Sequence, residues 1–183
     1  ITVTLKEELP FRVSTDFNSA TWYYMQINSG GWEFVRNDGE APYTNTTNRS
    51  DLNEGCQWAF VGDALNGFKI LNKTTGANQT LSFDGTVADG TVTKMKEENK
   101  LWTIEKGNGG FVIRQRADEC LNDFNNDLKI WKNASSPQGA GSAFRVLSTS
   151  VTELTNWNNL SHYVLNAERS PLTYSTTDGK TTK

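Results

Sequence analysis

The sequence predicts an all-β domain built from three similar segments. The chain has 183 residues and is 36% hydrophobic, which suits one domain with a core of ordinary size. Short alternating runs rich in aromatic and β-branched residues are separated by Gly, Asn and Asp, and no stretch keeps a helical period over a dozen residues. The same pattern recurs along the chain, which indicates a repeated unit.

The first sign of the repeat is a set of three segments that begin with an aromatic residue, contain apolar residues and end on an amide. Their first residues, Tyr24, Phe68 and Phe111, are 44 and 43 positions apart. Each segment is followed by a turn signal and a second apolar position, which predicts a β-hairpin in each repeat. These second apolar positions are Phe34, Leu81 and Leu121.

A second set of aromatic residues keeps the same period near the end of each repeat. Trp58, Trp102 and Phe144 are 44 and 42 positions apart, so we expect them at equivalent core positions around a pseudo-threefold axis. About twelve short strands in three copies fit a closed barrel capped by hairpins, which leaves no exposed sheet edge. The predicted fold is therefore a β-trefoil of three pseudo-repeats, each about 43 residues long.

The repeats also define the expected domain organisation. Residues 9–148 form the β-trefoil, residues 1–8 a short N-terminal extension, and residues 149–183 a C-terminal extension, a linker or the start of a further domain. The apolar residues of this last segment predict that its first half packs on the barrel or pairs with residues 1–5.

Composition narrows the classes of partner. The net charge is −3 and no run of five or six Lys or Arg occurs, so nucleic acid and anionic membrane surfaces are poor partners. No stretch approaches the length of a membrane-spanning apolar segment, so we expect no membrane insertion.

Cys56 and Cys120 form no C-x-x-C pair, and no ligand cluster predicts a metal or cofactor. The favoured interpretation is two buried thiols, with a single disulfide as the alternative.

Particular residues resemble those of a known family. Residues 57–60, Gln-Trp-Ala-Phe, resemble the Q-x-W ending of repeats in ricin B-type lectins, and residues 120–123 with 128–131 resemble the strands that build a sugar subsite there. The resemblance implies that the partner is a glycan or polysaccharide. Residues 58–63 and 66–70 are similar to trefoil modules of secreted bacterial carbohydrate-active enzymes. This similarity implies further domains in the parent chain and a secreted, periplasmic or cell-surface location.

In this family an acidic residue after the second strand of a repeat binds sugar hydroxyls, and a nearby aromatic ring stacks on the apolar face of the pyranose. The resemblance places the best such site in the third repeat. Asn122 is in strict register with the acidic residue, Asp123 follows one position later, Trp131 stands at the aromatic position, and Asn133 follows closely.

The other sites resemble the family pattern less closely. In the first repeat Asp38 and Tyr43 keep an acid and an aromatic at a comparable spacing, so this repeat ranks second. The second repeat has Asp84 but no aromatic after it, and is expected to be structural. The third repeat itself departs from the pattern, because Lys129 replaces an amide and residues 139–142 lack the Asn-Gln pair.

Each candidate residue also has a purely structural interpretation. Trp131 belongs to the core or, if Ile130 points inward, faces outward toward a ligand. Asp123 either binds sugar or holds the loop up to residue 127 through an Asx turn, and Asp38 is first of all a turn signal before Gly39.

The function expected from these observations is a carbohydrate-binding module that targets a parent enzyme or surface protein to glycans and has no catalytic residues. The alternative is a structural or protein-interaction β-trefoil with degenerate sugar sites, because one fold serves several functions. A third hypothesis, a fragment of a catalytic unit, would depend on His162, the single histidine, which lies beyond the repeats.

Overall fold

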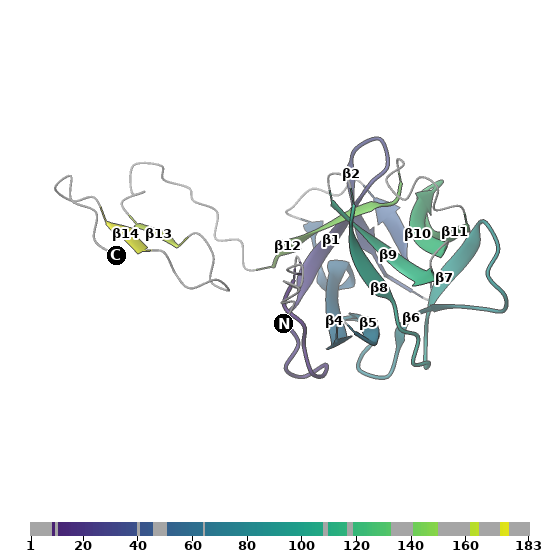
Figure 1. Cartoon of the computed structure of the whole chain (residues 1–183), viewed down its shortest axis with the longest axis horizontal. Coiled ribbons are helices and arrows are strands. Elements are labelled where there is room, and N and C mark those ends of the chain that lie inside the picture. The colour runs from purple at the N-terminus through teal and green to yellow at the C-terminus, as the bar shows by residue number, and fades with distance from the viewer. Residues whose placement is uncertain are drawn as a thin grey trace, which may run out of the picture. The chain divides into compact units, whose positions relative to one another are not determined.

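The structure is a computed structural model of the whole chain (Figure 1). It describes residue 9 and residues 11–39, 41–45, 51–63, 65–107, 110–116, 119–132, 141–149, 162–164 and 173–175. The chain divides into two compact units, Ile1–Thr149 and Ser150–Lys183. Among the described residues, no helix has the length and the apolar character needed to cross a membrane.

Within the described part of the first unit, six antiparallel strands close into a ring. They are β1 (Tyr23–Asn28), β4 (Gln57–Asp63), β5 (Gly67–Asn72), β8 (Thr103–Gly107), β9 (Gly110–Arg116) and β12 (Ala143–Ser148). Strand β1 pairs with β4 and β4 with β5, while β8 pairs with β9, β9 with β12, and β12 with β1 again. The ring is completed by the bridge from Phe68 in β5 to Trp102, which directly precedes β8.

Three hairpins lie outside this ring. They are β2 (Trp32–Arg36) with β3 (Tyr43–Asn45), β6 (Thr80–Phe83) with β7 (Thr91–Lys96), and β10 (Glu119–Phe124) with β11 (Asp127–Lys132). Strand β11 also pairs with β3 and with β7, so the three hairpins are joined to one another. A 3-10 turn, η2 (Glu54–Cys56), leads into β4.

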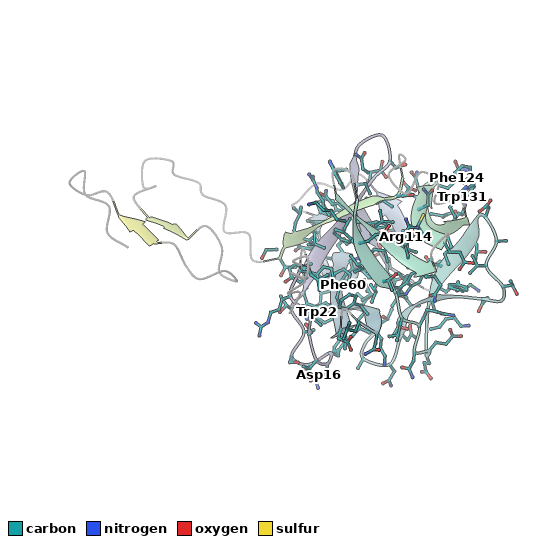
Figure 2. All side chains as sticks on the ribbon, viewed as in Figure 1. Asp16, Trp22, Phe60, Arg114, Phe124 and Trp131 are labelled. Carbon is teal, nitrogen blue, oxygen red and sulfur yellow. The ribbon has the colours of Figure 1, made fainter. Side chains whose placement is uncertain are left out.

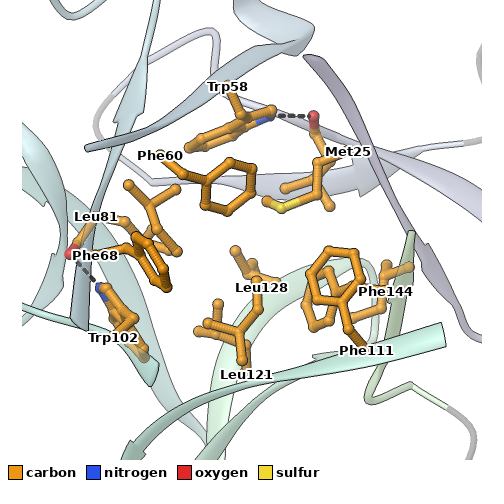
Figure 3. Packing of buried hydrophobic residues seen from close by; sticks show 14 of the residues in the cluster. Met25, Trp58, Phe60, Phe68, Leu81, Trp102, Phe111, Leu121, Leu128 and Phe144 are labelled. Atoms are coloured by element: carbon orange, nitrogen blue, oxygen red, sulfur yellow. Dashed lines mark hydrogen bonds between the residues drawn. The ribbon is translucent and has the colours of Figure 1, made fainter. Parts of the chain in front are cut away.

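The core is filled by side chains that point inward from the ring and from the hairpins (Figure 3). Trp58, Trp102 and Phe144 are each fully buried, as their spacing predicted. The indole Nε1 of Trp58 donates to the backbone oxygen of Val35 at 2.8 Å, and that of Trp102 donates to the backbone oxygen of Leu81 at 2.9 Å (Figure 3). Trp58 thus ties ring strand β4 to β2, and Trp102, directly before β8, is tied to β6 in the same way.

Both cysteines are buried and unbridged, as the favoured interpretation held. The thiol of Cys120 lies 3.8 Å from the backbone oxygen of Trp131, on the β10–β11 hairpin. Burial raises the pKa of the Cys56 thiol above its ordinary value. Both side chains therefore serve as small apolar groups in the packing.

The second unit contains two paired strands among its described residues, β13 (His162–Val164) and β14 (Thr173–Ser175). This part of the chain therefore has sheet structure of its own. The expected pairing with residues 1–5 lies outside the described residues.

Candidate functional site on the third hairpin

The β10–β11 hairpin turns through two asparagines. Asn125 and Asn126 have φ values of 58° and 64°, in the left-handed region that asparagine tolerates better than most residues. Phe124 and Asp127 are paired on either side of them, which makes a two-residue turn. The turn fixes the register of the hairpin, and the register decides which side chains share a face.

One face of this hairpin points outward and carries two of the predicted site residues. Cys120 is opposite Trp131, and Asn122 is opposite Lys129. Residues directly opposite one another in an antiparallel pair point to the same side, so Asn122 and Trp131 are diagonal neighbours on one face. Ile130 is fully buried on the other face, which leaves Trp131 half-buried and turned outward.

This face carries an aromatic surface. Phe124 lies beside the turn and Trp131 lies opposite Cys120, and their rings are 5.0 Å apart between centroids at an angle of 35° (Figure 2). Phe124 is 46% exposed, an unusual fraction for a phenylalanine. Trp131 is more covered, and the Cζ3 atom of its ring lies 3.8 Å from where a side chain on Gly90 would begin.

Polar groups border the aromatic surface. The ammonium of Lys129 is 5.4 Å from the centroid of the Phe124 ring and pairs with a carboxylate oxygen of Asp127 at 2.9 Å. The side-chain Nδ2 of Asn122 donates to the hydroxyl of Ser142 at 2.8 Å. The face therefore combines exposed carbon with an amide and a held ammonium group.

Asp123 lies on the opposite face of β10 from Asn122 and is 6% exposed. It is in the strand, where its backbone N–H donates to the oxygen of Gly141 at 2.7 Å, so it does not form the Asx turn that was the alternative interpretation. Among the described residues, its Oδ1 has no hydrogen-bond partner. This geometry does not bring Asp123 to the surface beside Trp131. Asn133 lies outside the described residues.

The first hairpin brings its two candidates into contact. The hydroxyl of Tyr43 donates to Oδ2 of Asp38, and the guanidinium of Arg36 binds the same oxygen at 3.1 Å. Burial, followed by the hydrogen bond to Asp38, raises the pKa of Tyr43, so the phenol remains a donor at neutral pH. A side chain on Gly55 would begin only 2.5 Å from Oδ1 of Asp38. The carboxylate of Asp38 is therefore already engaged by the hairpin itself.

The second hairpin uses its acid to join β6 to β7. Asp84 follows β6 and binds the ammonium groups of Lys94 and Lys96, each at 2.7 Å. These hydrogen bonds lower the pKa of Asp84 to about 2. Lys96 also pairs with Glu98 at 2.7 Å, so its ammonium group bridges two carboxylates.

Among the described residues, no group of three or more His, Cys, Asp or Glu side chains could hold a metal ion. The third hairpin offers an aromatic ring that can contact CH groups and polar groups that can bond hydroxyls.

Comparisons with solved structures agree with this architecture. The Macrolepiota procera ricin B-like lectin, solved in complex with lactose, is 15% identical with a TM-score of 0.59 over 74% of this chain and 98% of the lectin. The Rhizoctonia solani agglutinin is 10% identical with a TM-score of 0.58, over 70% of this chain and 95% of its own. An arabinofuranosidase solved with arabinofuranosyl-alpha-1,2-xylobiose is 12% identical with a TM-score of 0.55, over 74% of this chain but 33% of the enzyme.

No protein-family model matches the chain, and a search of curated proteins gives no match either. The structural likeness concerns the fold, because the identities are low. The chain thus has the ricin B-like β-trefoil fold, and the predicted fold class is confirmed.

Sequence reasoning missed Phe124 as a member of the site. The run from Asn122 to Asp127 is rich in Asn and Asp, so it suggests a long loop, whereas β10 continues to Phe124 and only two residues form the turn. A usable signal was present, because alternation outward from buried Leu121 puts Asn122 and Phe124 on one face.

Proposed function

We propose that this domain binds carbohydrate through the outward face of the β10–β11 hairpin, with Phe124, Trp131, Asn122 and Lys129 as contact residues. The observation that carries the proposal is the aromatic surface of Phe124 and Trp131 with an amide and an ammonium group at its edge. A pyranose has CH groups on one face and hydroxyls around its rim, so it matches a flat ring bordered by hydrogen-bonding groups.

In the proposed complex the sugar ring packs on Phe124, which is the more exposed of the two aromatic rings. Trp131 packs against Phe124 and adds the exposed part of its own half-buried ring. Hydroxyl groups of the sugar bond to Asn122, which Ser142 holds in position, and to Lys129. Such a site is shallow and individually weak, and gains strength through multivalency on a polymeric ligand.

The comparisons support a glycan as the partner. A lectin with this fold was solved with lactose, and a second structure of this fold is an agglutinin. The arabinofuranosidase match, which covers a third of that enzyme, supports a role as an accessory module of a longer chain. We propose that the module targets its parent protein to glycans outside the cytoplasm and performs no catalysis itself.

The proposal is tested by a glycan array probed with the wild-type chain and with Phe124→Ala. We expect binding to at least one class of glycan, and a loss of about tenfold or more in affinity for the variant, because the stacking surface is removed. Since Phe124 is about half exposed and lies outside the buried core, the melting temperature should change much less than on substitution of a core residue.

A matched control is Leu65→Ala, because Leu65 is an exposed apolar residue between β4 and β5, at 88% exposure. This variant should bind as the wild type does. Absence of binding to any glycan by a chain shown to be folded would contradict the proposed function, as would equal affinities of wild type and Phe124→Ala.

A further inference from the structure

A shallow, open hollow with a volume of about 390 Å³ lies outside the aromatic surface of Phe124 and Trp131. It is lined by residues 98–101 and by Gln115. The first four belong to the turn between β7 and β8, and Gln115 lies near the end of β9. The hollow is thus built by the barrel and the turn leading into Trp102, and it shares no lining residue with the aromatic surface of Phe124 and Trp131.

Gln115 is the amide that ends one of the repeated segments, and its counterpart in the preceding repeat is Asn72. Asn72 is fully buried, and its Nδ2 donates to the backbone oxygens of Gly55 at 2.9 Å and Gln57 at 3.3 Å. Its Oδ1 accepts from the backbone N–H and the hydroxyl of Thr74. The amide of Asn72 therefore fastens the turn that leads into Trp58.

At Gln115 no corresponding hydrogen bonds of the side-chain oxygen are found among the described residues. Its Oε1 is buried but has no hydrogen-bond partner among them. A buried carbonyl oxygen without a donor is costly, and it is normally satisfied by water or by a ligand. The turn at residues 98–101 stands where the turn of Gly55 and Gln57 stands before Trp58, and here a hollow replaces the bonded contact.

The rim of the hollow is held in place before any ligand arrives. Glu98 accepts from the hydroxyl of Ser82 at 2.6 Å and pairs with Lys96 at 2.7 Å, and both contacts lower its pKa, so the carboxylate is ionised at neutral pH. The ammonium of Lys100 lies 4.3 Å from the centroid of the Phe83 ring. Leu101 is 38% exposed and offers a carbon surface.

We propose that this hollow is a second ligand site, which takes one sugar unit of a glycan. A sugar hydroxyl can both donate and accept a hydrogen bond. One hydroxyl can therefore donate to Oε1 of Gln115 and accept from the amide N–H of Asn99. The remaining hydroxyls meet the carboxylate of Glu98, and the CH groups of the ring pack on Leu101. The terminal torsion of glutamine is broad, so the amide turns toward a ligand at little cost. The ligand class rests on the proposed function, whereas the lining of the site includes no residue of the third hairpin.

The test is a titration of the full chain followed by backbone amide NMR, with lactose and with a xylo-oligosaccharide as separate probes. Shifts at residues 98–101 and 115 are expected with at least one probe, in the wild type and also in Phe124→Ala. Shifts confined to the third hairpin would overturn this inference and leave the proposed function standing. Shifts confined to the hollow would support the inference and contradict the proposed hairpin site, and no shifts with either probe would overturn both.

The variant Gln115→Met separates a binding role from a structural one. It keeps the length of the side chain but removes the amide, so binding at the hollow should weaken about tenfold. The melting temperature should stay the same or rise, because a buried acceptor without a partner is removed. Undiminished shifts at residues 98–101 in this variant would overturn the inference.

The matched control is Asn72→Leu, at the corresponding position of the preceding repeat. There the amide is fully bonded, so this variant should melt at a lower temperature while it keeps the shifts at the hollow.

Discussion

The buried indoles show most clearly how single residues hold this fold together. Trp102 has no exposed surface, and its Nε1–H satisfies the backbone oxygen of Leu81. Replacing it by Phe removes this donor and part of the ring volume, and leaves the Leu81 oxygen without its partner in a buried environment. Both losses act against the folded state alone.

We therefore expect Trp102→Phe to lower the free energy of unfolding by about 2–3 kcal/mol, measured by urea denaturation. Trp22→Phe serves as the control, because Trp22 is half-buried and packs edge-on against Phe17 rather than in the barrel. Equal destabilisation by the two changes would contradict the role assigned to Trp102.

For individual residues, the sequence predicted the positions of core side chains better than those of the candidate site. The spacing of Trp58, Trp102 and Phe144 predicted full burial, because residues that repeat with the fold occupy repeated positions in it. Alternation with Ile130 left two directions open for Trp131, and the burial of Ile130 in the structure selects the outward one. The burial of the Asp123 side chain could not be predicted from the sequence. It depends on the hairpin register, which places Asp123 in a strand and not in a turn.

Among the elements, the β6–β7 hairpin is the one most dependent on charge. Asp84 is bound by Lys94 and Lys96, which lowers its pKa from 3.8 to about 2. A carboxyl group with a lowered pKa in the folded state stabilises that state when it is ionised. Its contribution is complete above the unfolded pKa and disappears as the pH falls through the folded pKa.

We expect Asp84→Asn to be less stable than the wild type at pH 7, with a difference that shrinks as the pH falls from about 4 to about 2 and is gone below that range. Chemical denaturation across this pH range measures it. Glu97→Gln, an exposed change in the next turn, is the control and should show a smaller difference. A difference for Asp84→Asn that stays constant down to pH 2 would contradict the ion-pair interpretation.

The elements themselves were largely predictable, because alternation and turn residues act locally. The three segments that end on an amide became β1, β5 and β9, and the second apolar positions became part of β2, β6 and β10. The difference in hydrogen bonding between the amides of Asn72 and Gln115 was not predictable, because both residues end the same repeated segment in the sequence. Their different surroundings depend on the turns that the folded barrel brings next to them.

For the whole molecule, the ring of six described strands explains why a chain with few long strands has a stable core. Closure pairs every strand of the ring on both sides, and the linked hairpins cover one end of the barrel interior. This scaffold supports the β10–β11 hairpin at both edges, because β10 pairs with β9 and β11 pairs with β3 and β7, and the proposed shallow site depends on such support. The repeat period predicted the architecture of the barrel. The strands β13 and β14 lie beyond the three repeats, so the period could not predict them.

The central claim is that the outward face of β10–β11 binds sugar through Phe124. The most direct measurement is a crystal structure of the chain with the best ligand found on a glycan array. We expect a sugar ring packed on Phe124, with hydroxyl groups at hydrogen-bond distance from Asn122 and Lys129. An ordered glycan bound elsewhere, with the face of Phe124 and Trp131 bare and free of crystal contacts, would contradict it.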